Sequence, residues 1–309
     1  MNPMDFLNDA RFVDIGDLPT GFKPYSFKQI YMRQLILEEL NLIHTGMASR
    51  VRPYQHIIRA VQLCCSANVL ELTDGDFEYL MAWLRKHSYP DFPSIAKYTC
   101  KHLVYVRKDN SIEFDEAIAK RDGLKLQPCN ADVKELVRNT KIRVHTIDDH
   151  LDLADDEIDY PRISTLTDYY DEVDQRPELK ITGKIARWVK AGSTFAEKLK
   201  ILEDQPDLRL WEKIERVMNV YYHGITEVMN LKCGECGNVM QHEAQPRLLS
   251  FFADNSEVDI FNMSYNMLTH FNIPPDMKLP VKMFFYHHNT FVMDKKKAEQ
   301  QALAKRGGR

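Results

Sequence analysis

Two cysteines separated by two residues are the strongest chemical signal in the sequence. They stand in the segment Cys233-Gly-Glu-Cys236-Gly, where a glycine helps the chain to turn. Two thiolates at this spacing can bind the same tetrahedral metal ion, typically zinc. The pair supplies only half of a four-ligand site, so further ligands must come from elsewhere in the chain. We expect a zinc ion with a structural role.

Two histidines lie close enough in the sequence to complete such a site. His223 precedes the first cysteine by ten residues, and His242 follows the second by six. With Cys233 and Cys236 they predict a Cys2His2 ligand set, although this spacing matches no standard zinc finger.

Distant thiols offer an alternative. Cys100 or Cys129 could complete the site at the Cys-x-x-Cys pair. Cys100 and His102 would also point the same way on a strand and could share an ion with Cys129. For Cys100-Lys-His102 we favour the simpler interpretation of a half-buried cysteine beside an exposed histidine.

Enzyme motifs do not accompany the cysteine pair. His242-Glu243 is not a metalloprotease motif, because Pro246 stands where the second histidine would be. A redox pair would begin a helix after a strand, whereas here a helix is expected before the pair and a proline-containing loop after it. We recognise no phosphate-binding glycine loop, serine nucleophile elbow or kinase signature. We therefore expect that the protein is not an enzyme.

The composition is that of an ordinary globular protein. The 309 residues are 44% apolar, enough for about two domains with sizeable cores. A net charge of −4 gives no general case for nucleic-acid binding. Six cysteines are too few for a disulfide scaffold, which indicates manufacture in a reducing cytoplasm. No apolar run is long enough to cross a bilayer, and we expect no secretory signal at the N-terminus.

Apolar periodicity predicts an α+β fold that is predominantly helical. The first half should contain helices over 26–43, from Pro53 to Cys64 and over 73–87, followed by strands at 97–107 and 141–147. The second half should contain helices near 194–204, 208–223, 258–268 and 281–294, with a β-knuckle around the cysteine pair. Trp211 and Ile214 should share the buried stripe of the helix over 208–223.

These patterns predict two helical regions, each with a small β-knuckle or sheet appended. The expected division is an N-terminal arm at 1–25, a helical region with a small β element at 26–147, an acidic linker or loop region at 148–192, a helical domain with the Cys-x-x-Cys knuckle at 193–294, and a basic tail at 295–309.

The order of these features resembles the baseplate hub proteins of contractile-tailed, T-even-like bacteriophages. One matching block is LTDGDFEYLMAWLRKHSY (Leu72–Tyr89), followed by the strand that bears Cys100. The other is the segment Phe195–Gly237, in which a helix pair, a His-Gly turn and a strand lead into the Cys-x-x-Cys knuckle. Phe251-Phe252 and the helix-rich C-terminus also look similar. The chain departs from the pattern at Cys100, where relatives carry a second Cys-x-x-Cys.

This resemblance implies a structural subunit of the phage tail baseplate hub, or an assembly factor for that hub. Such a protein would be located in the virion after synthesis in the host cytoplasm. Its partners would be other hub and tail proteins and the tape-measure protein. Two other functions remain open: a zinc-knuckle nucleic-acid-binding protein, which would need more basic residues around the knuckle than Lys232 alone, and a metal-dependent enzyme.

Overall fold

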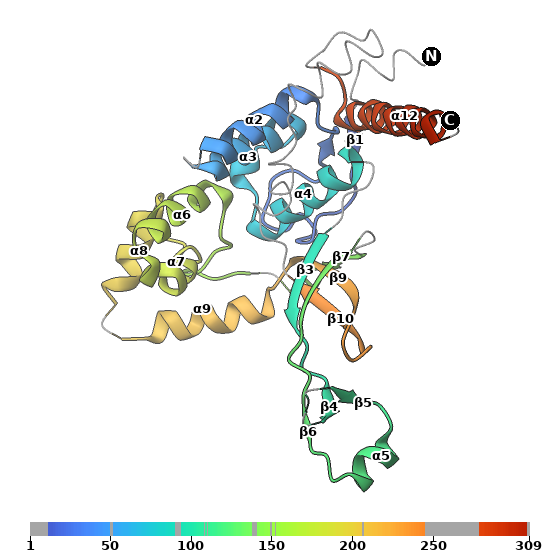
Figure 1. Cartoon of the computed structure of the whole chain (residues 1–309). Coiled ribbons are helices and arrows are strands. Elements are labelled where there is room, and N and C mark those ends of the chain that lie inside the picture. The colour runs from blue at the N-terminus through green and yellow to red at the C-terminus, as the bar shows by residue number, and fades with distance from the viewer. Residues whose placement is uncertain are drawn as a thin grey trace. The chain divides into compact units, whose positions relative to one another are not determined.

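The computed structural model describes residues 12–49, 52–89, 94–107, 109, 111–137, 141–148, 150–151, 153–205, 207–244 and 278–307. The chain divides into two compact units (Figure 1). The helical unit comprises residues 1–90, 144–225 and 246–309, and the β unit comprises residues 91–143 and 226–245. The predicted α+β class is confirmed. Both units are discontinuous in sequence, because the chain passes from one to the other four times.

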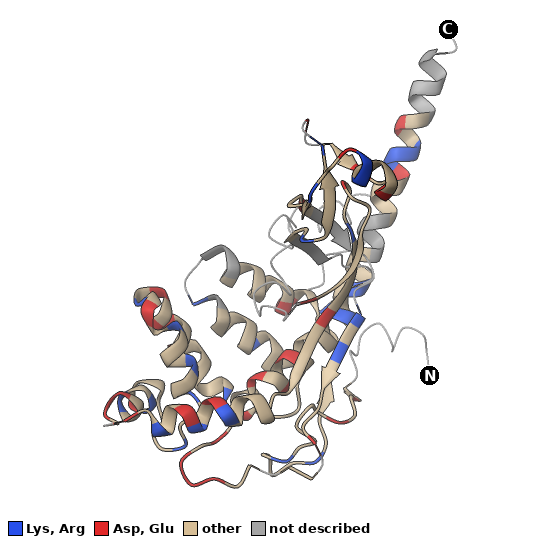
Figure 2. Ribbon diagram, turned by 90° about the horizontal axis from the view of Figure 1, so that it is seen from below, with Lys and Arg blue, Asp and Glu red and all other residues tan. Residues whose placement is uncertain are grey.

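In its described residues, the helical unit contains helices of different lengths, the longest of 27 residues, and a small two-stranded sheet. Its elements are β1 (Val13–Asp14), β2 (Tyr31–Met32), α2 (Leu37–Ser49), α3 (Pro53–Cys64), η1 (Val69–Glu71), α4 (Asp74–Ser88), η2 (Ile163–Thr165), α6 (Leu166–Gln175), η3 (Pro177–Leu179), α7 (Lys180–Ala186), α8 (Phe195–Glu203), α9 (Arg209–Val220) and α12 (Val281–Gly307). Acidic and basic residues are interspersed along these helices (Figure 2). In the part of the chain that is described, no helix is long and apolar enough to span a membrane.

The β unit consists of short antiparallel strands and a single turn-and-a-half of helix. Its elements are β3 (Ser94–Thr99), β4 (Leu103–Val106), β5 (Ile112–Glu113), α5 (Glu116–Arg121), β6 (Leu126–Pro128), β7 (Asp132–Val137) and β10 (Val239–Ala244), with most of β8 (Lys141–His145) and β9 (Gly224–Lys232). β3 pairs with β7, β4 lies between β5 and β6, and β9 lies between β8 and β10.

Helix capping explains where two of the predicted helices begin. The Thr73 hydroxyl accepts a hydrogen bond from the backbone N–H of Asp76 and caps α4. Thr194 and Glu197 form the predicted capping box of α8. The apolar face predicted for α4 is buried, since Phe77, Leu80, Met81 and Leu84 have no measurable exposure.

The helix predicted to begin at Ser26 begins instead at Leu37. Residues before it are extended, because β2 pairs with β1 and Met32 forms a β-bridge with Cys65. The Glu39 carboxylate accepts a hydrogen bond from the backbone N–H of Ile36 at 2.8 Å and pairs with the Arg33 guanidinium. Tertiary pairing therefore overrides the capping-box spacing at Ser26.

Two segments predicted to be peripheral belong to the core of the helical unit. Within the described part of the expected N-terminal arm, Leu18 and Phe22 are buried. Within the expected acidic linker, Ile158, Tyr160 and Ile163 are buried, and the segment continues through α6 and α7. In each case spaced apolar residues anchor a sequence whose polar composition suggests exposure.

The C-terminal region is helical further than the sequence predicts. α12 continues to Gly307, through most of the segment expected to be a basic tail. Its first turn is anchored by the buried side chains of Val281 and Phe284, and the backbone N–H of Val281 donates to the carbonyl of Leu35 at 2.9 Å. The predicted helix at 258–268 and the Phe251-Phe252 pair lie outside the described residues.

Candidate metal centre

Four cysteine thiols converge in the β unit. Cys100, Cys129, Cys233 and Cys236 each offer one sulfur, and all four sulfurs lie within 4.8 Å of one another. The Sγ atoms of Cys100 and Cys236 are 3.7 Å apart, and those of Cys129 and Cys233 are 3.9 Å apart. All four cysteines are free thiols. A disulfide would need a separation of about 2 Å, so this cluster is an arrangement of separate thiols.

The sulfur separations match a tetrahedral metal site. A zinc–sulfur bond of about 2.3 Å in tetrahedral geometry places neighbouring sulfurs about 3.8 Å apart. The two distances of 3.7 and 3.9 Å bracket this value. The four residues therefore fit a metal ion of the zinc type.

The first half of the cluster is built by a pair of turns held together by backbone hydrogen bonds. Cys100 follows β3, and Cys129 lies between β6 and β7. The N–H of Cys129 donates to the carbonyl of His102 at 2.8 Å, and the N–H of Asn130 donates to the carbonyl of Cys100 at 2.8 Å. Asn130 has φ of 54°, a left-handed conformation that asparagine tolerates better than most residues. These bonds hold the first two sulfurs close together.

The second half is the turn of a β-hairpin. Cys233 directly follows β9, and Cys236 lies in the turn that leads to β10. The N–H of Cys233 donates to the carbonyl of Asn238, and the N–H of Gly237 donates back to the carbonyl of Cys233, both at 2.9 Å. Gly237 has φ of 70°, which explains the glycine after the second cysteine. The sequence signal at the Cys-x-x-Cys pair therefore corresponds to a real structural turn.

Burial and mutual contact shift the pKa values of these thiols. Cys100 and Cys233 are buried, and Val104 packs against them. Burial raises the pKa of Cys233, but hydrogen bonds from the backbone N–H groups of Cys236 and Glu235 bring it down to about 7. Burial raises the pKa of Cys236 to about 12, and its contact with Cys233 adds to the increase. Four close thiolates need a cation to ionise together, and a bound metal ion supplies that charge.

The two histidines predicted as ligands are placed elsewhere. In the helical unit, His223 has both ring nitrogens engaged: Nε2 is 2.8 Å from the hydroxyl of Thr73, and Nδ1 is 2.9 Å from the carbonyl of Tyr221. His242 lies on β10, and its ring stacks on Tyr98 with centroids 6.3 Å apart. The structure brings neither histidine to the sulfur cluster.

The thiols that lie beside the Cys-x-x-Cys pair are the distant Cys100 and Cys129. These two thiols were an alternative from the sequence. Cys100, expected to be a half-buried strand cysteine, is instead fully buried just after β3, and its sulfur belongs to the cluster. The side chain of His102 is exposed, and only its backbone carbonyl takes part, through its bond to Cys129. Spacing could not identify this pairing because the two halves are about a hundred residues apart.

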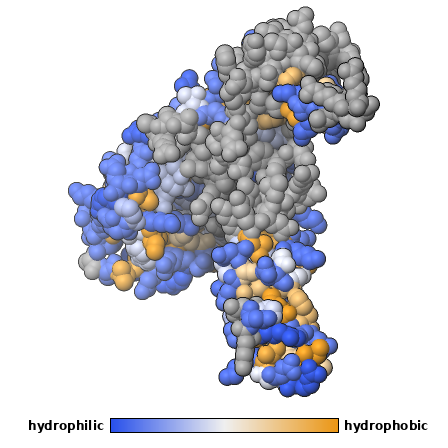
Figure 3. Space-filling view, in the orientation of Figure 1, coloured by the Kyte–Doolittle hydropathy of each residue, from blue (hydrophilic) through white to orange (hydrophobic). Residues whose placement is uncertain are grey.

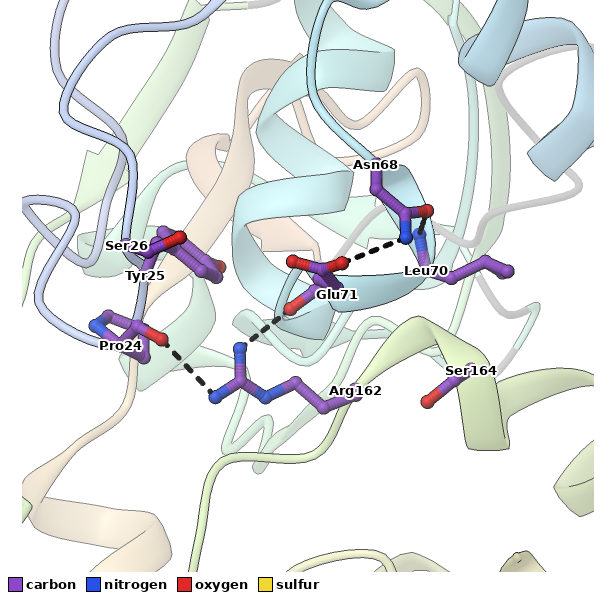
Figure 4. Close-up of a pocket in the computed structure, with 8 residues that line it drawn as sticks. All are labelled: Pro24, Tyr25, Ser26, Asn68, Leu70, Glu71, Arg162 and Ser164. Carbon is purple, nitrogen blue, oxygen red and sulfur yellow. Dashed lines mark hydrogen bonds between the residues drawn. The ribbon is translucent and has the colours of Figure 1, made fainter. Parts of the chain in front are cut away.

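A pocket in the helical unit is unrelated to the sulfur cluster. It has a volume of about 520 Å³ and is lined by Tyr25, Asn68, Glu71 and Arg162, among others (Figure 4). The Arg162 guanidinium donates to the carbonyls of Glu71 at 2.6 Å and Pro24 at 3.4 Å and lies over the Tyr25 ring. The polar groups of this pocket therefore form hydrogen bonds that connect the segments around Pro24, Glu71 and Arg162.

Comparison with known proteins assigns neither a family nor a function to this chain. Neither a protein-family model, a curated protein nor a solved structure matches this chain.

Proposed function

We propose that the protein is a structural subunit of a contractile phage tail baseplate hub, or an assembly factor for that hub, with a zinc ion bracing its β unit. The observation that supports a structural role is the closed set of four thiolates. Four protein ligands fill a tetrahedral zinc ion, whereas catalytic zinc keeps a position open for water or substrate. Cys100, Cys129, Cys233 and Cys236 together supply that full set.

The fold is compatible with the sequence blocks that resemble hub proteins. The block at Leu72–Tyr89 forms α4 with its N-terminal cap, and the block at Phe195–Gly237 forms α8, α9, β9 and the knuckle turn. The departure from the family pattern is the replacement of the first Cys-x-x-Cys by Cys100 and Cys129 on separate turns. Both arrangements deliver two thiols, so the departure does not remove the metal site.

Exposed apolar residues on the β unit support a role in protein–protein contact. Partner residues in antiparallel strands share a sheet face, so Leu103 and Pro128 lie on one face of the β5-β4-β6 sheet with Tyr105 and Leu126. The opposite face carries Val104, which packs against the cysteines. Leu103 and Leu126 are 55% and 51% exposed. Figure 3 shows hydrophobic residues at the surface of this unit. Exposed apolar patches of this kind often mark interfaces.

The proposal is tested by locating the protein in phage particles. Quantitative mass spectrometry of purified virions and of assembly intermediates should detect the protein in one of them. Presence in mature tails at a fixed ratio to other tail proteins supports a permanent subunit. Presence only in intermediates supports an assembly factor, and absence from both contradicts either role.

Elemental analysis of the purified protein should give about one zinc ion per chain, and a chain without metal would contradict the zinc site.

A further inference from the structure

A second pocket in the helical unit has features suited to a basic side chain. It has a volume of about 290 Å³ and lies among α7, α8 and α9. Leu202 is buried, while Trp211 is half-buried and Leu208 is 67% exposed. The pocket therefore has an apolar and aromatic lining that remains open to solvent.

The charged groups at this pocket are both acidic. Glu203 and Asp207 line it and are exposed, and neither forms an ion pair with another residue in the part of the chain that the structure describes. Glu203 is also the last residue of α8, where the helix dipole favours a positive charge. A lysine or arginine could lay its aliphatic stem on Leu202 and Trp211 and place its cation near the two carboxylates.

The same chain carries a basic segment of matching chemistry. Residues 295–309 contain six basic residues and one acidic residue, in a chain whose net charge is −4. Within this segment, Lys295, Lys296 and Lys297 lie on α12 and are exposed. From Met293 to Gln300 every side chain of α12 is exposed, so this stretch of helix lacks the packing that usually stabilises helices in water.

The geometry of the helical unit favours a contact between copies. The start of α12 is fixed by the buried Val281 and Phe284 and lies against α2 and α4. In Figure 1, α12 and the α8–α9 region lie at different ends of the helical unit. A continuous helix anchored at one end does not turn back to the pocket of its own chain.

We propose that the pocket formed by Leu202, Glu203, Asp207, Leu208 and Trp211 binds the basic C-terminal segment of a second copy of this chain, beginning at Lys295. In this contact the C-terminal segment of one copy binds the pocket of another. Two copies that exchange their segments form a reciprocal dimer. A larger number of copies forms a ring if the rotation from each copy to the next brings the last copy back to the first. This inference does not depend on the proposed tail role.

The test uses two full-length variants that each lose one side of the contact. The pocket variant carries Glu203→Gln and Asp207→Asn, and the tail variant carries Lys295→Gln, Lys296→Gln and Lys297→Gln. Light scattering should show concentration-dependent association of the wild-type protein that weakens as salt is added. Each variant alone should associate at least tenfold more weakly.

Mixing the two variants provides the decisive measurement. The intact pocket of the tail variant can accept the intact tail of the pocket variant, so the mixture should form a 1:1 heterodimer that neither variant forms alone. A charge-matched control, Glu212→Gln with Glu215→Gln on the same helix α9, should associate as the wild type does. Thermal melting of each variant checks that it is folded. A wild-type protein that stays monomeric, or variants that associate like the wild type, would overturn the proposal.

Discussion

Cys100 and Cys236 are 136 positions apart in the sequence, yet their sulfur atoms are 3.7 Å apart in the β unit. This contact joins the turn after β3 to the β9–β10 hairpin. The β unit is small and its strands are short, and three of the four buried residues of this cluster, Cys100, Cys233 and Cys236, are cysteines. A domain with so little core usually requires a metal or disulfides for stability.

The first prediction concerns the identity of the ligands. Cys129→Ser should reduce bound zinc from about one ion per chain to a small fraction, because three thiolates and a hydroxyl form a much weaker site. His242→Ala should leave the zinc content unchanged, since its ring stacks on Tyr98 away from the cluster. Elemental mass spectrometry on chelator-free protein measures both.

A control for this experiment is Cys64→Ser, because Cys64 is a buried thiol of α3 and no member of the cluster. Loss of zinc in His242→Ala with retention in Cys129→Ser would contradict the four-thiolate site and support the ligand set predicted from the sequence.

The second prediction concerns His223. His223→Phe should lower the free energy of unfolding by about 1–3 kcal/mol, the usual cost of removing one partner of a buried hydrogen bond. The affected groups are the Thr73 hydroxyl and the Tyr221 carbonyl. Urea unfolding followed by circular dichroism gives the free energy, and zinc analysis should show no change. A variant of normal stability that has lost its metal would show that His223 is a ligand.

The third prediction is a pH dependence that originates at Glu78 on α4. Burial, with a contribution from Asp74, raises the pKa of Glu78 from 4.5 to about 8, although Lys184 opposes the shift. Between these two values the folded protein holds a proton that the unfolded chain has released. The contribution of Glu78 to stability is therefore complete below about pH 4.5 and is lost as pH rises toward about 8.

The measurement is the difference in unfolding free energy between the wild type and Glu78→Gln at several pH values between about 5 and about 8. As pH rises, the unfolding free energy of the wild type should fall steadily relative to that of Glu78→Gln. Metal release at low pH affects both proteins equally and cancels in this comparison. A difference that does not vary with pH would show that Glu78 titrates normally.

The fourth prediction concerns two residues of α9 that the sequence placed on the same buried stripe. Ile214 has no measurable exposure, whereas Trp211 is half-buried at the edge of a pocket. Ile214→Ala should therefore cost about 2–5 kcal/mol. Trp211→Ala should cost less than about 2 kcal/mol, although a fully buried aromatic would cost about 3–5. Denaturant unfolding of both variants tests the ranking, and a larger loss at Trp211 would contradict it.

Sequence patterns predicted local features, such as helix caps and turns, more accurately than they predicted contacts between distant segments. The caps at Thr73 and Thr194 and the turn at Cys233–Gly237 depend on neighbouring residues, and the structure contains all three. The sequence could not show that β2 would pair with β1 and displace the start of a helix to Leu37. That outcome depends on contacts between distant segments.

The cluster of four cysteines illustrates the same limit. The Cys-x-x-Cys pair was recognisable because both thiols are local, but Cys100 and Cys129 lie on different turns and have no spacing in common with it. His223 looked like a ligand because it is near the pair in the chain. Its role in the structure is to bond Thr73, which lies 150 positions away.

The order of the four cysteines has a consequence for how the protein is made. Cys129 and Cys233 are 104 positions apart, so a ribosome adding about 5–20 residues per second needs about 5–20 s between them. During that interval the first two thiols have emerged without the partners that complete their coordination. A nascent chain can therefore hold a metal ion firmly only after the hairpin has left the ribosome. Capture of the proposed ion by all four thiols would therefore come after most of the polypeptide has been synthesised.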